Sequence, residues 1–295
     1  MSAIVEEAAG HAGQTEPTAG APRIRRRRSL TLTVGIVLFG IVVVVALVSF
    51  FWLPFPSSDT SGGRLEHPDA THWLGTDKLG RDLLTQLMIG ARIALAVGIG
   101  SVAIGALIGI TLGLLAAFAT TWLDDTISAA LDILIAFPTL LLAMLIVAAQ
   151  GASLGTAILA IGLAMSAVIA RLTRVLAKRV LSQQYVTAAR TSGTSWFGVI
   201  GRHIMPNIWP TLEVSLALQF GVAVLAEASL SYLGLGAPPP NASWGRLLQE
   251  AQGTVAVAPV GAIAPGVALV VLVIGVNLIA DGLRDVADPT RRRAR

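Results

Sequence analysis

Three polar residues lie inside long apolar segments of this 295-residue chain, where an unpaired polar group is costly. Glu227 is within segment 210–235, and Gln219 precedes it by eight residues, so that about 80° separates their side chains around a helix. Asn277 is within segment 256–280. Such side chains face a water-filled path or hydrogen-bond to a neighbouring helix. The sequence therefore predicts that Gln219, Glu227 and Asn277 line a translocation path, with a structural hydrogen bond as the alternative.

Residue types that catalyse reactions or bind metals are sparse. The chain has no cysteine, and its four histidines are scattered without metal-ligand spacing: His11, His67, His72 and His203. No G-x-x-x-x-G-K-[ST] phosphate loop occurs. The arginines stand at the ends of apolar segments rather than among aromatic residues, which does not favour nucleic acid. We expect no catalytic residue, no metal site and no bound cofactor, and no enzymatic activity.

The composition indicates a chain whose fold is set by a lipid bilayer. Apolar residues make up 54% of the chain and charged residues 13%, and the mean hydropathy is +0.75, far from the values of soluble domains. Crossing a bilayer takes about 20 residues of apolar helix. The sequence predicts an all-α integral membrane protein with six transmembrane helices, near 30–53, 93–118, 127–149, 153–170, 210–235 and 256–280.

The basic residues predict the orientation of these spans. Five Lys and Arg precede the first span, six lie from Arg171 to Arg202 and five from Arg284 onward, which is sixteen of the 21 in the chain. Positive residues favour the cytoplasm, so both termini are expected there, in a bacterial plasma membrane. The prediction divides the chain into a disordered basic tail (1–29), the first span (30–53), an extracytoplasmic loop (54–92), a core (93–281) and a cytoplasmic tail (282–295).

The cytoplasmic segment 171–209 is too polar to cross the membrane and too long for a simple turn. Gly193 permits a sharp turn there and divides the segment into two short helical pieces, the second ended by Pro206 before the next span. The first piece offers the small Ala188 and Ala189 for close approach by another surface. An apolar stripe is predicted on the second, formed by Trp196, Phe197 and Ile200.

This segment resembles the EAA loop of ABC importer permeases, whose pattern is E-A-A, three residues, Gly, nine residues and I-x-L-P. Matching offsets are occupied by Ala188, Ala189, Gly193 and Pro206. Thr187, His203 and Met205 stand where the pattern has Glu, Ile and Leu. The resemblance implies an ATPase-coupling loop with the residues Thr187, Ala188, Ala189, Gly193, Trp196, His203 and Pro206. From the residues alone, a basic amphipathic helix on the membrane surface is the alternative.

A second stretch, from His72 to Ala94, resembles the H-x-L-G-T-D-x-L-G-R-D … G-A-R segment of the C-type permease subunit in the dipeptide, oligopeptide and nickel importer family. Thr76 or Asp77 is expected to cap a short interfacial helix that begins near Leu79. This segment is either architectural or a contact for a substrate-delivery protein. Further stretches resemble the same subunit in the same order, at 132–138, 226–236, 238–245 and 281–289.

The resemblance implies a MetI-like ABC importer permease bundle that carries di- or oligopeptides or a related small solute. It implies as partners a homologous second permease, two cytoplasmic ATPase subunits that bind ATP and Mg, and an extracytoplasmic substrate-binding protein. Dipeptides, longer peptides, nickel chelates, glutathione and haem remain open as substrates. A secondary transporter or channel that works alone is the alternative from another class, and a structural scaffold is a third.

Overall fold

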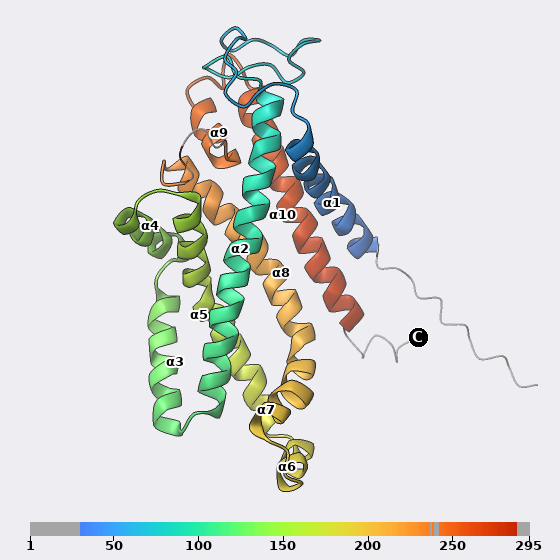
Figure 1. Ribbon diagram of the computed structural model, residues 1–295, viewed down its shortest axis with the longest axis vertical. Helices are drawn as coiled ribbons and strands as arrows, with labels where there is room; N and C mark the ends of the chain where they lie inside the picture. Colours follow the sequence, from blue (N-terminus) through green and yellow to red (C-terminus); the bar gives the residue numbers. More distant parts are fainter. Residues whose placement is uncertain (1–29, 237, 239–241, 288–295) are drawn as a thin grey trace, which may run out of the picture.

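The computed structural model describes residues 30–236, 238 and 242–287 of the chain. Within these residues the protein is a bundle of helices without a β-sheet, elongated along the helix axes (Figure 1). The predicted basic tail 1–29 and the last residues of the predicted tail 282–295 lie outside the described part. The helices are α1 Leu30–Phe51, α2 Leu83–Phe118, α3 Thr121–Ala136, α4 Thr139–Gln150, α5 Leu154–Leu181, α6 Gln184–Thr191, α7 Trp196–Val199, the π-helical turn η1 Ile200–Ile204, α8 Met205–Tyr232, α9 Trp244–Ala251 and α10 Val260–Ala287.

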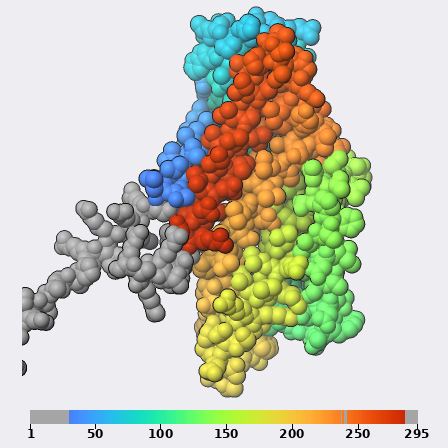
Figure 2. Space-filling model, turned by 180° about the vertical axis from the view of Figure 1, so that it is seen from behind, coloured from blue at the N-terminus to red at the C-terminus, as the bar shows by residue number. Residues whose placement is uncertain are grey.

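Two ends of the molecule are distinct. Residues 52–82 and α9 form one end, which we call the cap end, and α6 with α7 forms the other, which we call the α6 end (Figure 1). Seen from behind, the cyan loop covers one end of the molecule and the yellow residues of α6 reach furthest at the other (Figure 2). The ends of α1 and α10 nearest the chain termini both point towards the α6 end.

Within the described residues, five helices are long and apolar enough to cross a membrane, and the third predicted span is broken. Segment 127–149 was predicted as one helix, but α3 and α4 meet at an angle of 89°. Pro138 causes the break, because a proline disfavours the helical conformation of the residue before it and Phe137 is extended at ψ 131°. The part of the chain that the structure describes therefore has six membrane-spanning units only if this bent pair counts as one.

Helix α2 is a single helix of 36 residues, about 54 Å long, and it joins the cap end to the α6 end. The predicted interfacial helix near Leu79 is therefore wrong, since the first helix after the loop begins at Leu83 and continues into the span. Asp82, rather than Thr76 or Asp77, caps it by accepting a hydrogen bond from the Thr85 N–H at 2.7 Å. The whole helix can then move as one body.

Small residues let α2 lie close against α5. Gly105, Gly109 and Gly113 follow one another at every fourth position of α2, and a methyl group at any of them would collide with α5. Gly105 faces the side chain of Met165, Gly109 faces that of Ile169, and Gly113 faces the backbone around Ala170. Close backbone approach between small residues is how helices associate in membranes, where the hydrophobic effect does not drive them together.

Helix α5 extends past its predicted end at residue 170 to Leu181, so that Arg171, Arg174 and Lys178 lie on a helix rather than in a loop. Acidic residues of α3 compensate these charges. Arg174 donates to both carboxylate oxygens of Asp124, at 2.5 and 2.8 Å, and Lys178 also donates to Asp124. Arg171 pairs with Asp132 at 3.1 Å. Few apolar side chains are buried between α3 and α5, so these ion pairs help to hold the two helices together.

Helix α8 does not start after a break at Pro206, as predicted, because α7, η1 and α8 form one continuous helical segment from Trp196 to Tyr232. Pro206 lies in the first turn of α8, where its missing N–H is tolerated. The π-helical turn directly before it shifts the hydrogen bonds, so that the Met205 N–H donates to the carbonyl of Ile200, five residues back. The predicted second piece is thus the beginning of a membrane-spanning helix.

Candidate functional site

The segment that we call the coupling element comprises α6, the turn 192–195 and α7. Two valines attach it to the bundle, since Val186 is 2% exposed and Val199 is fully buried. They join an apolar cluster with residues of α5 and α8, among them Ala177, Ile204 and Ile208. The coupling element is therefore anchored to the ends of the two helices that flank it in the chain.

The turn of the coupling element depends on Gly193. Its φ is +88°, in the left-handed region that side chains disfavour. Helix α6 ends there because the N–H of Gly193 donates to the carbonyl of Arg190 and the N–H of Thr194 to that of Ala189, both at 3.0 Å. Ser195 then starts α7 by accepting a hydrogen bond from the Gly198 N–H at 3.2 Å. The predicted sharp turn at Gly193 is confirmed.

The outward face of the coupling element carries small side chains and one large apolar ring, beside exposed polar residues such as Gln184 and Ser192. Thr187, Ala188 and Gly193 are exposed, Ala189 is half-buried, and Phe197 is 87% exposed. An added methyl group at Gly193 would meet nothing within 4 Å. The predicted stripe is divided, since Phe197 faces outward while the Trp196 ring lies against Phe118 of α2.

His203 and Pro206 lie at the base of the coupling element. The His203 ring is 5.8 Å from the ring of Tyr185 on α6, and the His203 carbonyl accepts a hydrogen bond from Asn207 at 2.6 Å. Pro206 is exposed. The structure thus brings the predicted coupling residues into one unit, with Val186 and Val199 as anchors that the sequence pattern did not identify.

The three residues predicted to line a path have different surroundings. Glu227 is 2% exposed, and its carboxylate accepts a hydrogen bond of 2.6 Å from the Ser231 hydroxyl one turn further along α8. The Ser243 hydroxyl, at the start of α9, also interacts with this carboxyl. Gln219 is half-buried, as is Asn277 of α10, whose amide oxygen lies near Gly221 of α8. The burial and partners of Glu227 favour the structural hydrogen bond, and its place on a path stays a prediction.

The exposed face of α8 lies on the opposite side of the helix from Glu227. Its members recur every three or four residues, which keeps them on one face: Leu218, Val222, Leu225, Ser229 and Tyr232. We call this row of five residues the α8 stripe. Three of its members, Leu225, Ser229 and Tyr232, line an open groove of about 350 Å³ between α8, α9 and α10. Sequence reasoning missed it because α8 is apolar on most sides, so that only packing decides which side is left uncovered.

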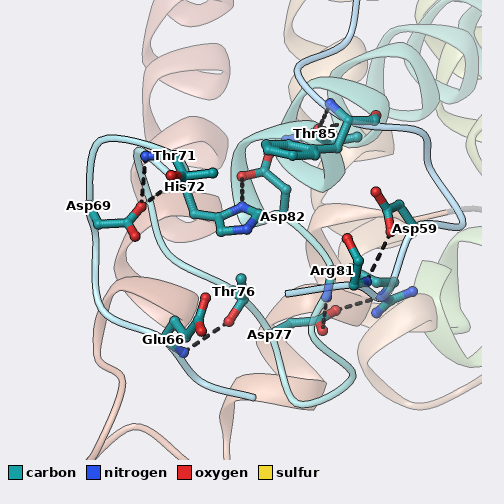
Figure 3. Close-up of polar contacts among 12 residues, drawn as sticks. Asp59, Glu66, Asp69, Thr71, His72, Thr76, Asp77, Arg81, Asp82 and Thr85 are labelled. Carbon is teal, nitrogen blue, oxygen red and sulfur yellow. Dashed lines mark hydrogen bonds and ion pairs between the residues drawn. The ribbon is translucent and has the colours of Figure 1, made fainter. Parts of the chain in front are cut away.

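At the cap end, the polar residues of the second motif hydrogen-bond to each other (Figure 3). The His72 ring lies 4.6 Å from the ring of Phe55, and its Nδ1 is 3.1 Å from Oδ1 of Asp82. Asp77 accepts hydrogen bonds from the backbone N–H groups of Leu79 and Arg81 and, at 2.6 Å, from Nε of Arg81. These contacts support an architectural role for the motif.

One ion pair joins the cap loop to α9. Arg81 donates from Nη2 to Glu250 at 2.9 Å, and the other carboxylate oxygen of Glu250 is 3.0 Å from Arg246.

Hydrogen bonds from the Ser61 side chain and backbone lower the pKa of Asp59. In the described part of the chain no three His, Asp or Glu side chains gather where they could hold a metal ion. Among the motif residues, the large side chains left exposed are Trp73 and Leu79.

The long helices, the bent pair and the coupling element at one end define a multi-pass membrane permease. Residues 109–293 match the family described as "Binding-protein-dependent transport system inner membrane component". Since this match covers more than half of the chain, the protein belongs to that family. It is a permease subunit of an ABC importer, a class that works with a partner permease, an ATPase and a substrate-binding protein. The alternatives of a lone transporter and a structural scaffold find no support in this match.

Characterised relatives are similar over most of their length. The glutathione transport system permease protein GsiD of Pectobacterium atrosepticum is 38% identical over 85% of this chain and 85% of its own. The dipeptide transport system permease protein DppC of Alkalihalophilus pseudofirmus is 37% identical over 87% of this chain and 84% of its own. A putative peptide transport system permease protein of Brucella suis is 38% identical over 94% and 93%.

A solved structure supports the fold. The chain resembles one from the MetNI methionine ABC transporter in inward-facing conformations, with a TM-score of 0.59 over 69% of this chain and 97% of that one. The two sequences are 21% identical, so this likeness concerns the fold alone. The predicted MetI-like bundle is confirmed.

Proposed function

We propose that this permease imports peptides or peptide-like solutes and receives the energy of ATP hydrolysis through the coupling element. The observation that carries the proposal is the outward face around Gly193, where small and apolar side chains are exposed at the far end of two long helices. A surface of this kind can enter a cleft of another protein, whereas a helix lying on a membrane would carry its basic residues on the polar face.

The proposed orientation places the α6 end in the cytoplasm. Three described arginines near this end support it: Arg179, Arg190 and Arg202. Both termini are then cytoplasmic, and the cap end is extracytoplasmic. The first residues of α3 include no basic residue, but Asp124 among them is the partner of Arg174 and Lys178 on α5, so the cluster as a whole is not acidic.

The proposed assembly has two homologous permeases, two cytoplasmic ATPase subunits and an extracytoplasmic substrate-binding protein. ATP and Mg bind to the ATPase subunits, and this chain carries neither a cofactor nor a catalytic residue. The α8 stripe suits the second permease, because an apolar face with residues at every third or fourth position packs well against another helix. Exposed Trp73 and Leu79 of the cap loop suit the binding protein, since large apolar side chains anchor protein interfaces.

The relatives favour peptides over the other predicted substrates. Their names specify dipeptides, peptides and glutathione, which share amide bonds and charged ends. Nickel chelates and haem lack the peptide amide bond. We therefore propose a short peptide or peptide-like solute, selected mainly by the binding protein.

The coupling role is tested with Gly193→Ala in the importer reconstituted with its partner subunits. The left-handed backbone at Gly193 costs about 1–2 kcal/mol with any side chain, so the turn should change and uptake of labelled dipeptides should fall about tenfold or more, while the bundle stays folded.

Two glycines supply matched controls for this substitution. Gly201 also has open space around it but an ordinary φ, and Gly151 has a φ of +90° in open space at the end of α4, outside the coupling element. Gly201→Ala and Gly151→Ala should both leave uptake near the wild-type rate. Normal uptake by the Gly193→Ala importer would refute the coupling role.

A further inference from the structure

We propose that Arg190 is a positioning residue that sets the orientation of the coupling element against α2 through the rings of Trp196 and Phe118. The inference rests on the proposed coupling function. Arg190 lies in the last turn of α6, and its Nη1 donates to the carbonyl of Thr194 at 2.5 Å. The same guanidinium lies 4.0 Å from the centre of the Trp196 ring. One side chain thus spans the turn at Gly193 and joins α6 to the start of α7.

The contact continues from Trp196 to α2. The rings of Trp196 and Phe118 meet edge to face, with centroids 5.2 Å apart and an interplanar angle of 74°. Phe118 is the last residue of α2, the helix that reaches from the α6 end to Asp82 in the cap loop. A change in the tilt of α6 therefore acts on a helix of 36 residues that connects both ends of the molecule.

Arginine suits this position better than other residues. Its planar guanidinium donates hydrogen bonds in its plane and stacks on an aromatic ring with its face, so that it can bind the Thr194 carbonyl and the Trp196 ring together. A lysine ammonium keeps the charge and can make a cation–π contact, but it has no plane to stack. The side chain thus fixes a direction in addition to supplying a charge.

Attachment of the coupling element depends on residues other than Arg190 and Trp196, although Phe118 also packs against the anchoring cluster. Val186 and Val199 are buried in the apolar cluster at the ends of α5 and α8, and they hold the element on the bundle. Arg190 and Trp196 are only partly covered. Loss of Arg190 should therefore leave the element attached, and the ATPase bound, while the angle between α6 and α2 is no longer set.

The test uses the complete importer in proteoliposomes with its binding protein and labelled dipeptides. Arg190→Gln should leave co-purification of the ATPase and basal ATP hydrolysis near wild type, while uptake per ATP hydrolysed falls about five- to tenfold, within the usual range of coupling between sites. Arg190→Lys should recover part of the loss. The matched control is Arg202→Gln, which changes an exposed arginine of η1 at the same end and should leave the ratio unchanged.

Phe118 separates this inference from a direct contact of Arg190 with the ATPase. Phe118→Leu changes no residue of the coupling element, yet it should lower uptake per ATP as Arg190→Gln does, and the double variant should be no worse than either single one. Trp196→Phe should keep most of the coupling and Trp196→Leu should lose it. Additive effects of Arg190→Gln and Phe118→Leu would overturn the proposal.

Two further results would overturn the proposal that Arg190 orients the coupling element. A third would instead overturn the proposed coupling function. A normal ratio in Arg190→Gln contradicts orientation by Arg190, and loss of the ATPase from that variant would assign it to attachment. If the wild-type chain itself neither binds an ATPase nor responds to one, the proposed coupling function fails, whatever the variants do.

Discussion

At the cap end the side chains of His72, Asp77 and Asp82 form hydrogen bonds within the loop, whereas at the α6 end Thr187, Ala188 and Phe197 face outward. The cap loop has little regular structure, so its shape depends on polar side chains that pair internally. The coupling element consists of short helices on an apolar anchor, which leaves its side chains free for another surface. One end thus keeps its shape through internal polar contacts, and the other leaves side chains exposed.

Each end nevertheless contains one buried aspartate, and the two have different tasks. Asp82 is 3% exposed and caps α2, while Asp124 is 5% exposed and ties α3 to α5. Substituting each of them compares an aspartate that caps a helix with one that ties two helices together through ion pairs.

The largest expected effect is that of Asp82→Ala. It removes the cap of α2 and leaves the buried His72 without its partner, and the two losses together should lower the free energy of unfolding by about 2–3 kcal/mol. Thermal unfolding in detergent measures it. Asp59→Ala removes a half-buried aspartate of the same loop, which accepts a hydrogen bond from the nearby Ser61 N–H, and should destabilise far less; equal effects of both substitutions would contradict an internally braced cap.

A smaller effect is expected for Asp124→Asn at the α6 end. The amide keeps the size of the side chain but leaves Arg174 and Lys178 without a countercharge, and partial exposure of both cations limits the loss to about 2 kcal/mol. The matched control is Asp132→Asn, whose pair with Arg171 is 59% exposed on both sides and should contribute less than about 0.5 kcal/mol. If α3 is instead held by packing, high salt should change the stability difference between each variant and the wild type only slightly.

Between the two ends, substitutions of Glu227 test whether its carboxylate makes a structural hydrogen bond or lines the translocation path. Glu227→Ala leaves the buried Ser231 hydroxyl without its partner and should lower stability by about 1–2 kcal/mol. Glu227→Gln can still accept that hydrogen bond, so stability and uptake should both stay near wild type. Strongly reduced uptake by an assembled Glu227→Gln importer would instead place the carboxylate on the translocation path.

The smallest expected change is that of Thr187→Glu, which restores the acidic residue of the EAA pattern on the exposed face of α6. Since Thr187 is exposed, stability should change by less than about 0.5 kcal/mol. Co-purification should show the ATPase still bound. Loss of stability comparable to that of Asp82→Ala would mean that the α6 end, like the cap end, uses its polar residues internally.

Much of the fold could be predicted from hydrophobic segments because each crossing needs a fixed length of apolar helix. The first span was predicted at 30–53 and α1 is Leu30–Phe51. Errors arose where charge was taken as the end of a helix. Helix α5 carries Arg171, Arg174 and Lys178 beyond its apolar part, since α3 supplies their partners. A single sequence contains no sign that these two helices lie side by side.

The coupling element was found from spacing, while the α8 stripe was not. The turn at Gly193 depends on neighbouring residues and on a backbone angle that glycine adopts readily, so it can be inferred locally. Which apolar face of α8 is uncovered depends on where α2, α5 and α10 pack. The same limit applies to Glu227, whose polarity in an apolar segment was evident but whose partners Ser231 and Ser243 depend on how α9 folds back on α8.

The sequence by itself determined that this chain crosses a membrane several times and carries a sharp turn at Gly193, because hydropathy, basic residues and glycine act over short distances along the chain. Only the tertiary structure decided that α2 runs unbroken between the two ends, that the third span is bent at Pro138, and that Arg190, Trp196 and Phe118 meet. Those features arise from contacts between residues far apart in the chain, which no local pattern specifies.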